Sequence, residues 1–177
     1  MYLQPEPFYL RHTIKVFQKG NIQEGQKVLI YGASGSLGTY AVQLARYYGA
    51  AVTGVCSRAN EELVRSLGAE QVIDYTKEDF TKSSQAYDVI FDAVGKTSRS
   101  ACKGLLKENG IFLTTNGLEK IKAGDLIFLR ELVEMGKLRP VIDRSYPLEQ
   151  IVEAHRYVDQ GHKKGNVVLT VSHADKT

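Results

Sequence analysis

The chain has 177 residues, of which 43% are hydrophobic and 24% are charged, and its formal net charge is +3. This length suits one domain with a sizeable core, and the ordinary composition excludes a collagen-like, Pro-rich or disordered chain. The small net charge does not indicate nucleic-acid binding, and the apolar runs are too short to cross a bilayer. Residues 1–7 lack the basic start and the apolar stretch of a signal peptide, so we expect a cytoplasmic protein.

The first half of the chain alternates short apolar runs with helical patterns. Residues 8–17 predict one separate helix, which belongs to a helical arm over residues 1–25. Strands are predicted over residues 27–31, 51–56, 71–74 and 87–91. The spacing of apolar residues predicts a helix over residues 36–48, and Asn60 can cap another helix that runs to residue 66.

The second half continues this alternation. It predicts helices over residues 98–107, 125–135 and 148–158, strands over residues 111–114 and 166–171, and an extended segment over residues 140–143. Residues 172–177 are polar, and we expect a frayed tail there. Strands crossed over by helices predict an α/β fold: a doubly wound, mostly parallel sheet of about six strands with helices on both faces. We therefore expect a single domain over residues 1–177.

The two cysteines, Cys56 and Cys102, are far apart and form no CxxC motif. Their number excludes a structural zinc site of the four-cysteine kind, and we expect no metal site. One disulfide is arithmetically open. Cys56 ends an apolar run, which favours a buried free thiol.

The most informative motif is the glycine loop, residues 32–38, whose sequence is GASGSLG. It follows a predicted strand and opens a predicted helix, which is the context of a dinucleotide-binding fingerprint with Ala33 in the first place. Gly35 would let the backbone approach a pyrophosphate, and Gly38 would let the helix pack closely on the strand. The free N–H groups of the helix start would face the phosphates. The alternative is a Gly-rich connection without a ligand.

The end of the second strand indicates which dinucleotide would bind. NAD sites usually place Asp or Glu there, and no acidic residue occurs between residues 25 and 60. Ser57 and Arg58 stand at this position instead, and both can hydrogen-bond a phosphate. This favours NADP(H) over NAD(H). The alternative is that Arg58 is one more solvated surface charge.

Further segments join the glycine loop in one pattern: residues 28–38 and 41–45, 67–75, 87–95, 136–143, 153–157 and 161–168. Together they resemble the medium-chain dehydrogenase/reductase superfamily and, more narrowly, its zinc-free quinone oxidoreductase branch. The resemblance covers residues 19–116 and 125–171. It implies a Rossmann-type NADP(H)-binding domain of an oxidoreductase. Such enzymes reduce quinones or the C=C bond of α,β-unsaturated carbonyls by direct hydride transfer, with a proton from water or a hydroxyl.

The resemblance also implies which residues contact the cofactor. Those at the pyrophosphate would be Ser34, Gly35, Ser36, Leu37 and Gly38. Those around the adenosine 2′-phosphate would be Ser57, Arg58, Asn60 and Tyr75. Those along the ribose and nicotinamide would be Val94, Gly95, Thr115 and Asn116, and Asn166 would lie near the cofactor. Asn60 replaces the Lys of many relatives, so Arg58 must compensate for the lost charge.

The chain departs from the family in two places. The family's N-terminal GroES-like domain, which forms the other wall of the active-site cleft, is expected to be absent. Only residues 117–124 stand where relatives have several tens of residues that commonly supply the last strands and the dimer edge. We therefore expect a trimmed nucleotide-binding half without an assigned catalytic residue. A homodimer, and a partner chain that supplies the absent domain, are left open.

Other assignments fit less well. The Tyr-x-x-x-Lys couple of short-chain dehydrogenases and the P-loop motif are absent, and the four histidines lack metal-ligand spacing. The tyrosines fall among core positions, which does not favour nucleic-acid binding. The segment His162-Lys163-Lys164 is interpreted as a solvated helix cap. Two hypotheses remain: an NADPH-binding domain of a quinone or enone reductase, and a non-catalytic NADPH-binding or interaction module. The expected absence of the GroES-like domain distinguishes the two hypotheses, because hydride transfer needs a dry, oriented site.

Overall fold

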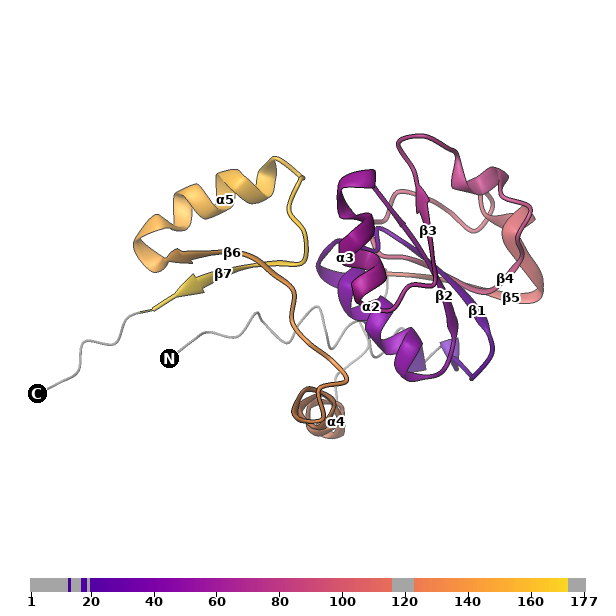
Figure 1. Ribbon diagram of the computed structural model, residues 1–177, viewed down its shortest axis with the longest axis horizontal. Coiled ribbons are helices and arrows are strands. Elements are labelled where there is room, and N and C mark those ends of the chain that lie inside the picture. The colour runs from indigo at the N-terminus through magenta and orange to yellow at the C-terminus, as the bar shows by residue number, and fades with distance from the viewer. Residues whose placement is uncertain (1–12, 14–16, 19, 116–122, 172–177) are drawn as a thin grey trace, which may run out of the picture.

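The structure is a computed structural model that describes residues 13, 17–18, 20–115 and 123–171 (Figure 1). Its main sheet has five parallel strands in the order β3-β2-β1-β4-β5, and β6 and β7 form a separate parallel pair. The strands are β1 (Lys27–Tyr31), β2 (Ala51–Cys56), β3 (Gln71–Asp74), β4 (Tyr87–Asp92), β5 (Leu106–Thr114), β6 (Ile142–Pro147) and β7 (Asn166–Thr170). The predicted fold class, a Rossmann-type α/β sheet, is confirmed.

The helices lie mainly on one face of the sheet. They are α2 (Ser36–Tyr47), α3 (Glu61–Ser66), α4 (Ala123–Glu134) and α5 (Ile151–Asp159), with the 3-10 turns η1 (Arg58–Asn60), η2 (Phe80–Lys82), η3 (Lys103–Leu105) and η4 (Leu148–Gln150). Side chains from α2, α3 and α4 share one core cluster with Val28 and Ile30 of β1. Leu29 points to the other face, as the alternation of a strand requires, and packs with Phe80 and Leu105.

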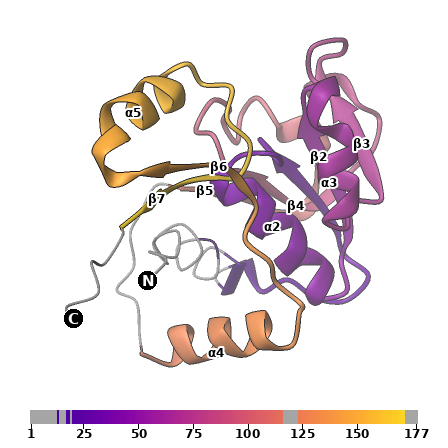
Figure 2. The ribbon, with the colours of Figure 1, turned by 60° about the vertical axis from the view of Figure 1, so that its left-hand side comes forward.

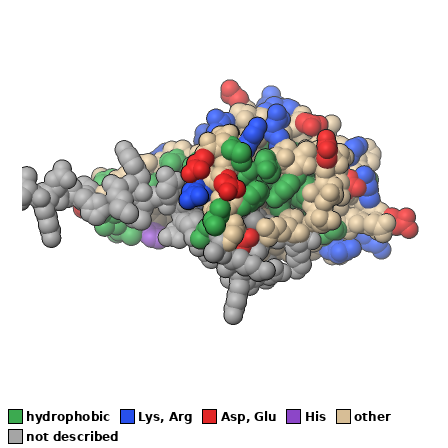
Figure 3. Space-filling view, turned by 90° about the horizontal axis from the view of Figure 1, so that it is seen from below, with side chains coloured by type: hydrophobic (Ala, Val, Ile, Leu, Met, Phe, Trp, Pro, Cys, Tyr) green, Lys and Arg blue, Asp and Glu red, His purple; other side chains and the backbone are tan. Residues whose placement is uncertain are grey.

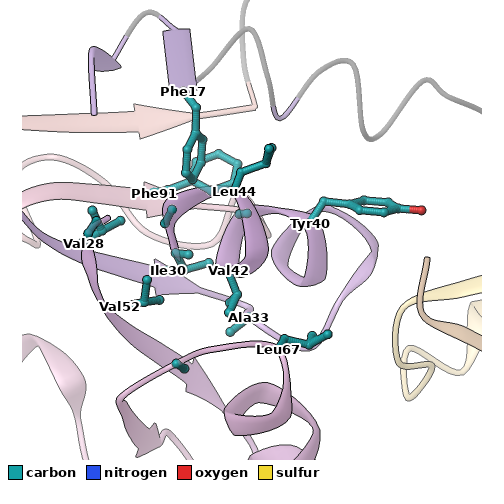
Figure 4. Packing of buried hydrophobic residues seen from close by; sticks show 14 of the residues in the cluster. Phe17, Val28, Ile30, Ala33, Tyr40, Val42, Leu44, Val52, Leu67 and Phe91 are labelled. Carbon is teal, nitrogen blue, oxygen red and sulfur yellow. The ribbon is translucent and has the colours of Figure 1, made fainter. Parts of the chain in front are cut away.

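The core beneath α2 is tightly filled (Figure 4). Phe17 meets Phe91 of β4 edge to face, with ring centroids 5.9 Å apart. Phe17 is helical and 1% exposed, although the predicted helix over residues 8–17 and the rest of the arm lie largely outside the described residues. Tyr40 points out of α2 toward the C-terminal part of the chain.

The predicted helix over residues 98–107 is wrong. The chain there forms turns and η3, and β5 already begins at Leu106. Gly104 weakens a helix at this point, and the Oγ of Ser98 accepts the N–H of Ala101 in a local turn. Pairing of Leu106 with Tyr87 then extends β5 through Asn109 and Gly110, with a register shift between Tyr87 and Val89. Phe80 of η2 and Leu105 of η3 pack on this second face. In the described residues, short 3-10 turns therefore cover the side on which the helix over residues 98–107 was predicted.

The prediction of about six strands in one sheet is also wrong, because β6 and β7 leave the main sheet. With α5 they form a β-α-β unit, residues 142–170, which we call the C-terminal unit. Figures 1 and 2 show it beside the N-terminal end of α2. The side chain of Gln43 in α2 binds the segment that leads to the C-terminal unit. It accepts a hydrogen bond from the N–H of Arg139 at 2.9 Å and donates one to the Arg139 carbonyl at 3.0 Å.

The outer side of α4 is apolar. Its exposed side chains include Leu126, Ile127 and Val133, and Met135 follows directly after the helix. Figure 3 looks from the side of α4 and shows hydrophobic side chains gathered on this face between charged ones. Among the described residues, none of the helices combines the length and the hydropathy that a bilayer crossing requires.

Candidate functional site

The glycine loop connects β1 to α2 at the carboxyl edge of the sheet. The N–H groups of Gly32 and Ala33 both donate to the carbonyl of Val55 at 3.0 Å, which ties the loop to β2. Gly32 has φ +81°, and a Cβ on Gly38 would lie 2.0 Å from the Gly32 carbonyl oxygen. The close approach of helix and strand that the sequence predicted for Gly38 is thus present, and it excludes any side chain there.

The N-terminus of α2 carries no side-chain cap. Gly35 is its N-cap residue with extended backbone, φ −79° and ψ 180°. A Cβ on Gly35 would meet only the Gly32 carbonyl oxygen, at 3.4 Å. The amides of the first helical turn, which begins with Ser36 and Leu37, have no intrahelical partner and lie at the positive end of the helix dipole. This geometry suits a phosphate group.

Three predicted contacts of the adenosine side lie together. The Nδ2 of Asn60 donates to the Oγ of Ser34 at 3.2 Å and to the Oγ of Ser57 at 3.3 Å. The N–H of Tyr75 donates to the carbonyl of Cys56, so Tyr75 follows β3 beside the end of β2. Its side chain is 52% exposed. The glycine loop and the ends of β2 and β3 therefore form one continuous polar surface.

Arg58 belongs to this surface but already has an acidic partner. Its guanidinium lies 2.8 Å from the carboxylate of Glu61, which also pairs with Arg65 at 3.0 Å. Glu61 lies one residue beyond the segment without acidic residues that ends at Asn60. A carboxylate close to the second strand weakens the argument against NAD(H), since such a group is what holds a ribose hydroxyl.

The loop after β4 is organised by Asp92, which sequence reasoning overlooked. Its buried carboxylate accepts the N–H groups of Val94 at 2.9 Å, Gly95 at 2.8 Å and Thr97 at 2.9 Å. These bonds fix Val94, whose side chain rests against Gly32 of the glycine loop. An Asp at the end of a buried strand with Gly three residues later is a turn signal that could have indicated this role.

Two predicted residues follow β5. Asp92 pairs with Thr114, so Thr115 lies beside the start of the β4 loop at the same edge of the sheet. Asn116 lies outside the described residues. Carboxyl ends of neighbouring parallel strands meet at one edge. Val94, Gly95 and Thr115 are therefore brought together with the glycine loop.

Asn166 sits deeper than the sequence suggested. It is 4% exposed, and its Nδ2 donates to the carbonyl of Val141 at 3.2 Å and the hydroxyl of Tyr40 at 3.4 Å. Lys163, interpreted from sequence as part of a solvated cap, instead reaches the glycine loop and is half-buried. Burial lowers the pKa of its ammonium group, and the charge of Asp143 acts in the opposite direction.

Both cysteines are buried and free, as the apolar surroundings of Cys56 predicted. Burial raises the pKa of the Cys56 thiol to about 11. In the described part of the chain, His, Cys, Asp and Glu form no group of three or more that could hold a metal ion.

The fold and the loop define a nucleotide-binding α/β domain of Rossmann type. A family model described as zinc-binding dehydrogenase matches residues 36–139, and a second with the same description matches residues 112–169. The chain therefore belongs to the zinc-binding dehydrogenase family, within the medium-chain dehydrogenases/reductases. The resemblance noted in the sequence is confirmed.

Several named relatives are reductases. The chain is 33% identical to the mouse mitochondrial NAD(P)H oxidoreductase RTN4IP1 over 84% of its length, covering 48% of that protein. It is 34% identical to the chloroplastic NADPH-dependent alkenal/one oxidoreductase of Arabidopsis thaliana over 82% of its length, covering 40% of that protein. The structure of the quinone oxidoreductase from Coxiella burnetii matches 93% of the chain and 58% of its own, with TM-score 0.85 and 28% identity. The chain thus spans about half the length of the curated relatives it matches.

Proposed function

We propose that this chain is the NADPH-binding part of a reductase that transfers a hydride to a quinone or to the C=C bond of an α,β-unsaturated carbonyl. The observation that carries the proposal is the uncapped N-terminus of α2 behind Gly35, held against β1 by the close approach of Gly38 to Gly32. The names of the relatives, an NADPH-dependent alkenal/one oxidoreductase among them, support the reaction class.

The residues present fit such a cofactor. Ser34, Gly35, Ser36, Leu37 and Gly38 would hold the pyrophosphate through the loop and the first turn of α2. On the adenosine side, Ser57, Asn60 and Tyr75 would surround the ribose, where the cluster of Asn60 with Ser34 and Ser57 offers hydroxyl and amide groups. Arg58 would pair with the 2′-phosphate once it leaves Glu61.

The nicotinamide end would lie where β4 and β5 finish. A bound NADPH supplies the hydride, and the chain's own residues orient the donor. Asp92 holds the loop that presents Val94 and Gly95, and Thr115 follows β5 at the same edge. Asn116 remains a candidate for this end from the family resemblance, and Asn166 remains a candidate residue near the cofactor. A fixed loop keeps the reacting ring in one orientation, which is the main contribution a binding domain makes to hydride transfer.

Titration calorimetry of the full chain with NADPH and with NADH tests the proposal. We expect both to bind and NADPH to bind more tightly; failure of both to bind would overturn it. Reduction of a simple quinone under saturating NADPH then separates the two hypotheses. Turnover at ordinary enzyme rates contradicts a non-catalytic module, whereas binding without turnover supports one. A cytoplasmic location is also proposed. Because the names of two relatives include an organelle, fractionation of cells that express the chain should check this location.

A further inference from the structure

Lys163, in the segment between α5 and β7, reaches across to the glycine loop. Its Nζ donates to the Oγ of Ser36 at 2.6 Å and to the carbonyl oxygen of Gly165 at 2.9 Å. Ser36 in turn donates to the same carbonyl at 2.8 Å, and the N–H of Gly165 donates to the carbonyl of Ser34 at 2.8 Å. The ammonium group is therefore held at the first residue of α2 by a network that joins the C-terminal unit to the loop.

Within the part of the chain that the structure describes, the ammonium group of Lys163 donates hydrogen bonds only to neutral groups. Both of them, a hydroxyl and a carbonyl, lack a full negative charge, and none of the ion pairs found among the described residues includes Lys163. The side chain is half-buried, and this burial disfavours its charged form, while the charge of Asp143 acts in the opposite direction without forming an ion pair with it. A partly desolvated ammonium gains most from an anion placed beside it.

The anion that fits is the one the loop is shaped for. Ser36 begins the uncapped helix α2, so a phosphate at this helix end would lie within reach of both its amides and the Lys163 ammonium. We propose that Lys163 supplies the counter-charge for the pyrophosphate of the dinucleotide, an inference that rests on the proposed function. Two parts of the protein then contribute to one site: the main sheet contributes the glycine loop, and the C-terminal unit contributes Lys163.

Neighbouring residues of the same segment do not share this position. Lys164 is exposed, and its N–H donates to the carboxylate of Asp143. Asn166 uses its amide nitrogen on Val141 and Tyr40. The pyrophosphate is common to NADPH and NADH, whereas the 2′-phosphate occurs only in NADPH. A role at the pyrophosphate therefore predicts equal dependence of both cofactors on Lys163.

The test measures binding of NADPH, NADH and adenosine 2′-monophosphate to the full chain by calorimetry or competition. Lys163→Met should weaken NADPH and NADH by the same factor, about tenfold or more, because a charge-assisted hydrogen bond is lost. It should leave adenosine 2′-monophosphate unchanged, since this ligand has no pyrophosphate. Lys163→Arg should retain most of the affinity, and Lys164→Met is the matched control without effect. Thermal unfolding without ligand checks that each variant folds.

Each other result overturns the inference. Unchanged binding by Lys163→Met, equal weakening of adenosine 2′-monophosphate, or a loss confined to NADPH would each show that Lys163 does not serve the pyrophosphate. If Lys163→Met does not fold, the arginine variant decides, and a large loss of affinity in a folded Lys163→Arg protein overturns the inference. If the unmodified chain binds neither dinucleotide, the proposed function fails and the inference with it. That outcome differs from all of the others.

Discussion

The guanidinium of Arg58 lies 2.8 Å from the carboxylate of Glu61, so the residue expected to recognise a 2′-phosphate is already paired. The Arg58 side chain is 71% exposed, and exposed pairs contribute only about 0.2–1 kcal/mol. A 2′-phosphate can compete with so weak a pair, but Glu61 also repels it.

Cofactor preference should therefore respond to both members of the pair. Arg58→Ala should weaken NADPH about tenfold and leave NADH unchanged, because only NADPH carries the 2′-phosphate. Glu61→Gln should tighten NADPH about two- to fivefold, since the competing carboxylate is gone. Titration calorimetry measures both, with Arg65→Ala as a control for the second partner of Glu61. An unchanged NADPH/NADH ratio in Arg58→Ala would remove Arg58 from the site.

Gly38→Ala should destabilise the protein. The added Cβ would lie 2.0 Å from the Gly32 carbonyl oxygen and 2.7 Å from the Cα of Ala33, both of which are backbone atoms. Helix and strand would have to separate, at a cost of about 1–3 kcal/mol or more. Denaturant unfolding measures the loss. Gly104→Ala is the control, because nothing lies within 4 Å of its added Cβ; equal stability of the two variants would refute the close approach.

Gly35→Ala should separate binding from folding. A Cβ at Gly35 meets only the Gly32 carbonyl oxygen at 3.4 Å, an ordinary contact, so stability should change by less than about 0.5 kcal/mol. The methyl group would stand where a phosphate must approach the start of α2. NADPH binding should fall steeply while the unfolding curve stays in place. Undiminished binding would mean that the phosphate does not contact the loop at Gly35.

Asp92→Asn should loosen the loop after β4. The Oδ1 of Asp92 accepts the N–H groups of Val94 and Gly95, and the Oδ2 accepts that of Thr97. An amide nitrogen cannot accept a hydrogen bond, so at least one of these N–H groups loses its charge-assisted bond, at about 1.5–3 kcal/mol. Hydrogen exchange over residues 93–97 should accelerate. Asp79→Asn, at an exposed turn, is the control variant. If exchange over residues 93–97 in Asp92→Asn stays as slow as in the unmodified protein, Asp92 does not hold this loop.

The buried thiol of Cys56 should not react with thiol reagents in the folded protein, and it should affect stability only at alkaline pH. Its pKa is raised from 9.0 to about 11 by burial, so the unfolded chain loses the proton first as pH rises. The contribution of Cys56 to the free energy of unfolding should therefore be constant below about pH 9 and fall between about pH 9 and 11. Ellman's reagent at pH 8 should find no accessible thiol until denaturant is added. Cys56→Ala should make the alkaline fall in stability smaller without abolishing it, because burial also raises the pKa of Tyr40 and Tyr87.

The alternation of β1, α2, β2, α3, β3 and β4 is predictable from the sequence, because buried parallel strands and the glycine loop have strong local signals. The same is true of the loop residues and of the buried state of Cys56. These features depend on neighbours in the chain, which the sequence displays directly.

Features that depend on distant partners could be seen only in the folded protein. Pairing of Leu106 with Tyr87 replaced a helix by a strand, and β6 and β7 left the main sheet to pair with each other. Lys163 contacts Ser36 although the two residues are 127 positions apart in the sequence, and no local sequence pattern predicts such a contact. Long-range pairing and burial overrode local propensity at these places, and they also determine which charges surround the candidate site.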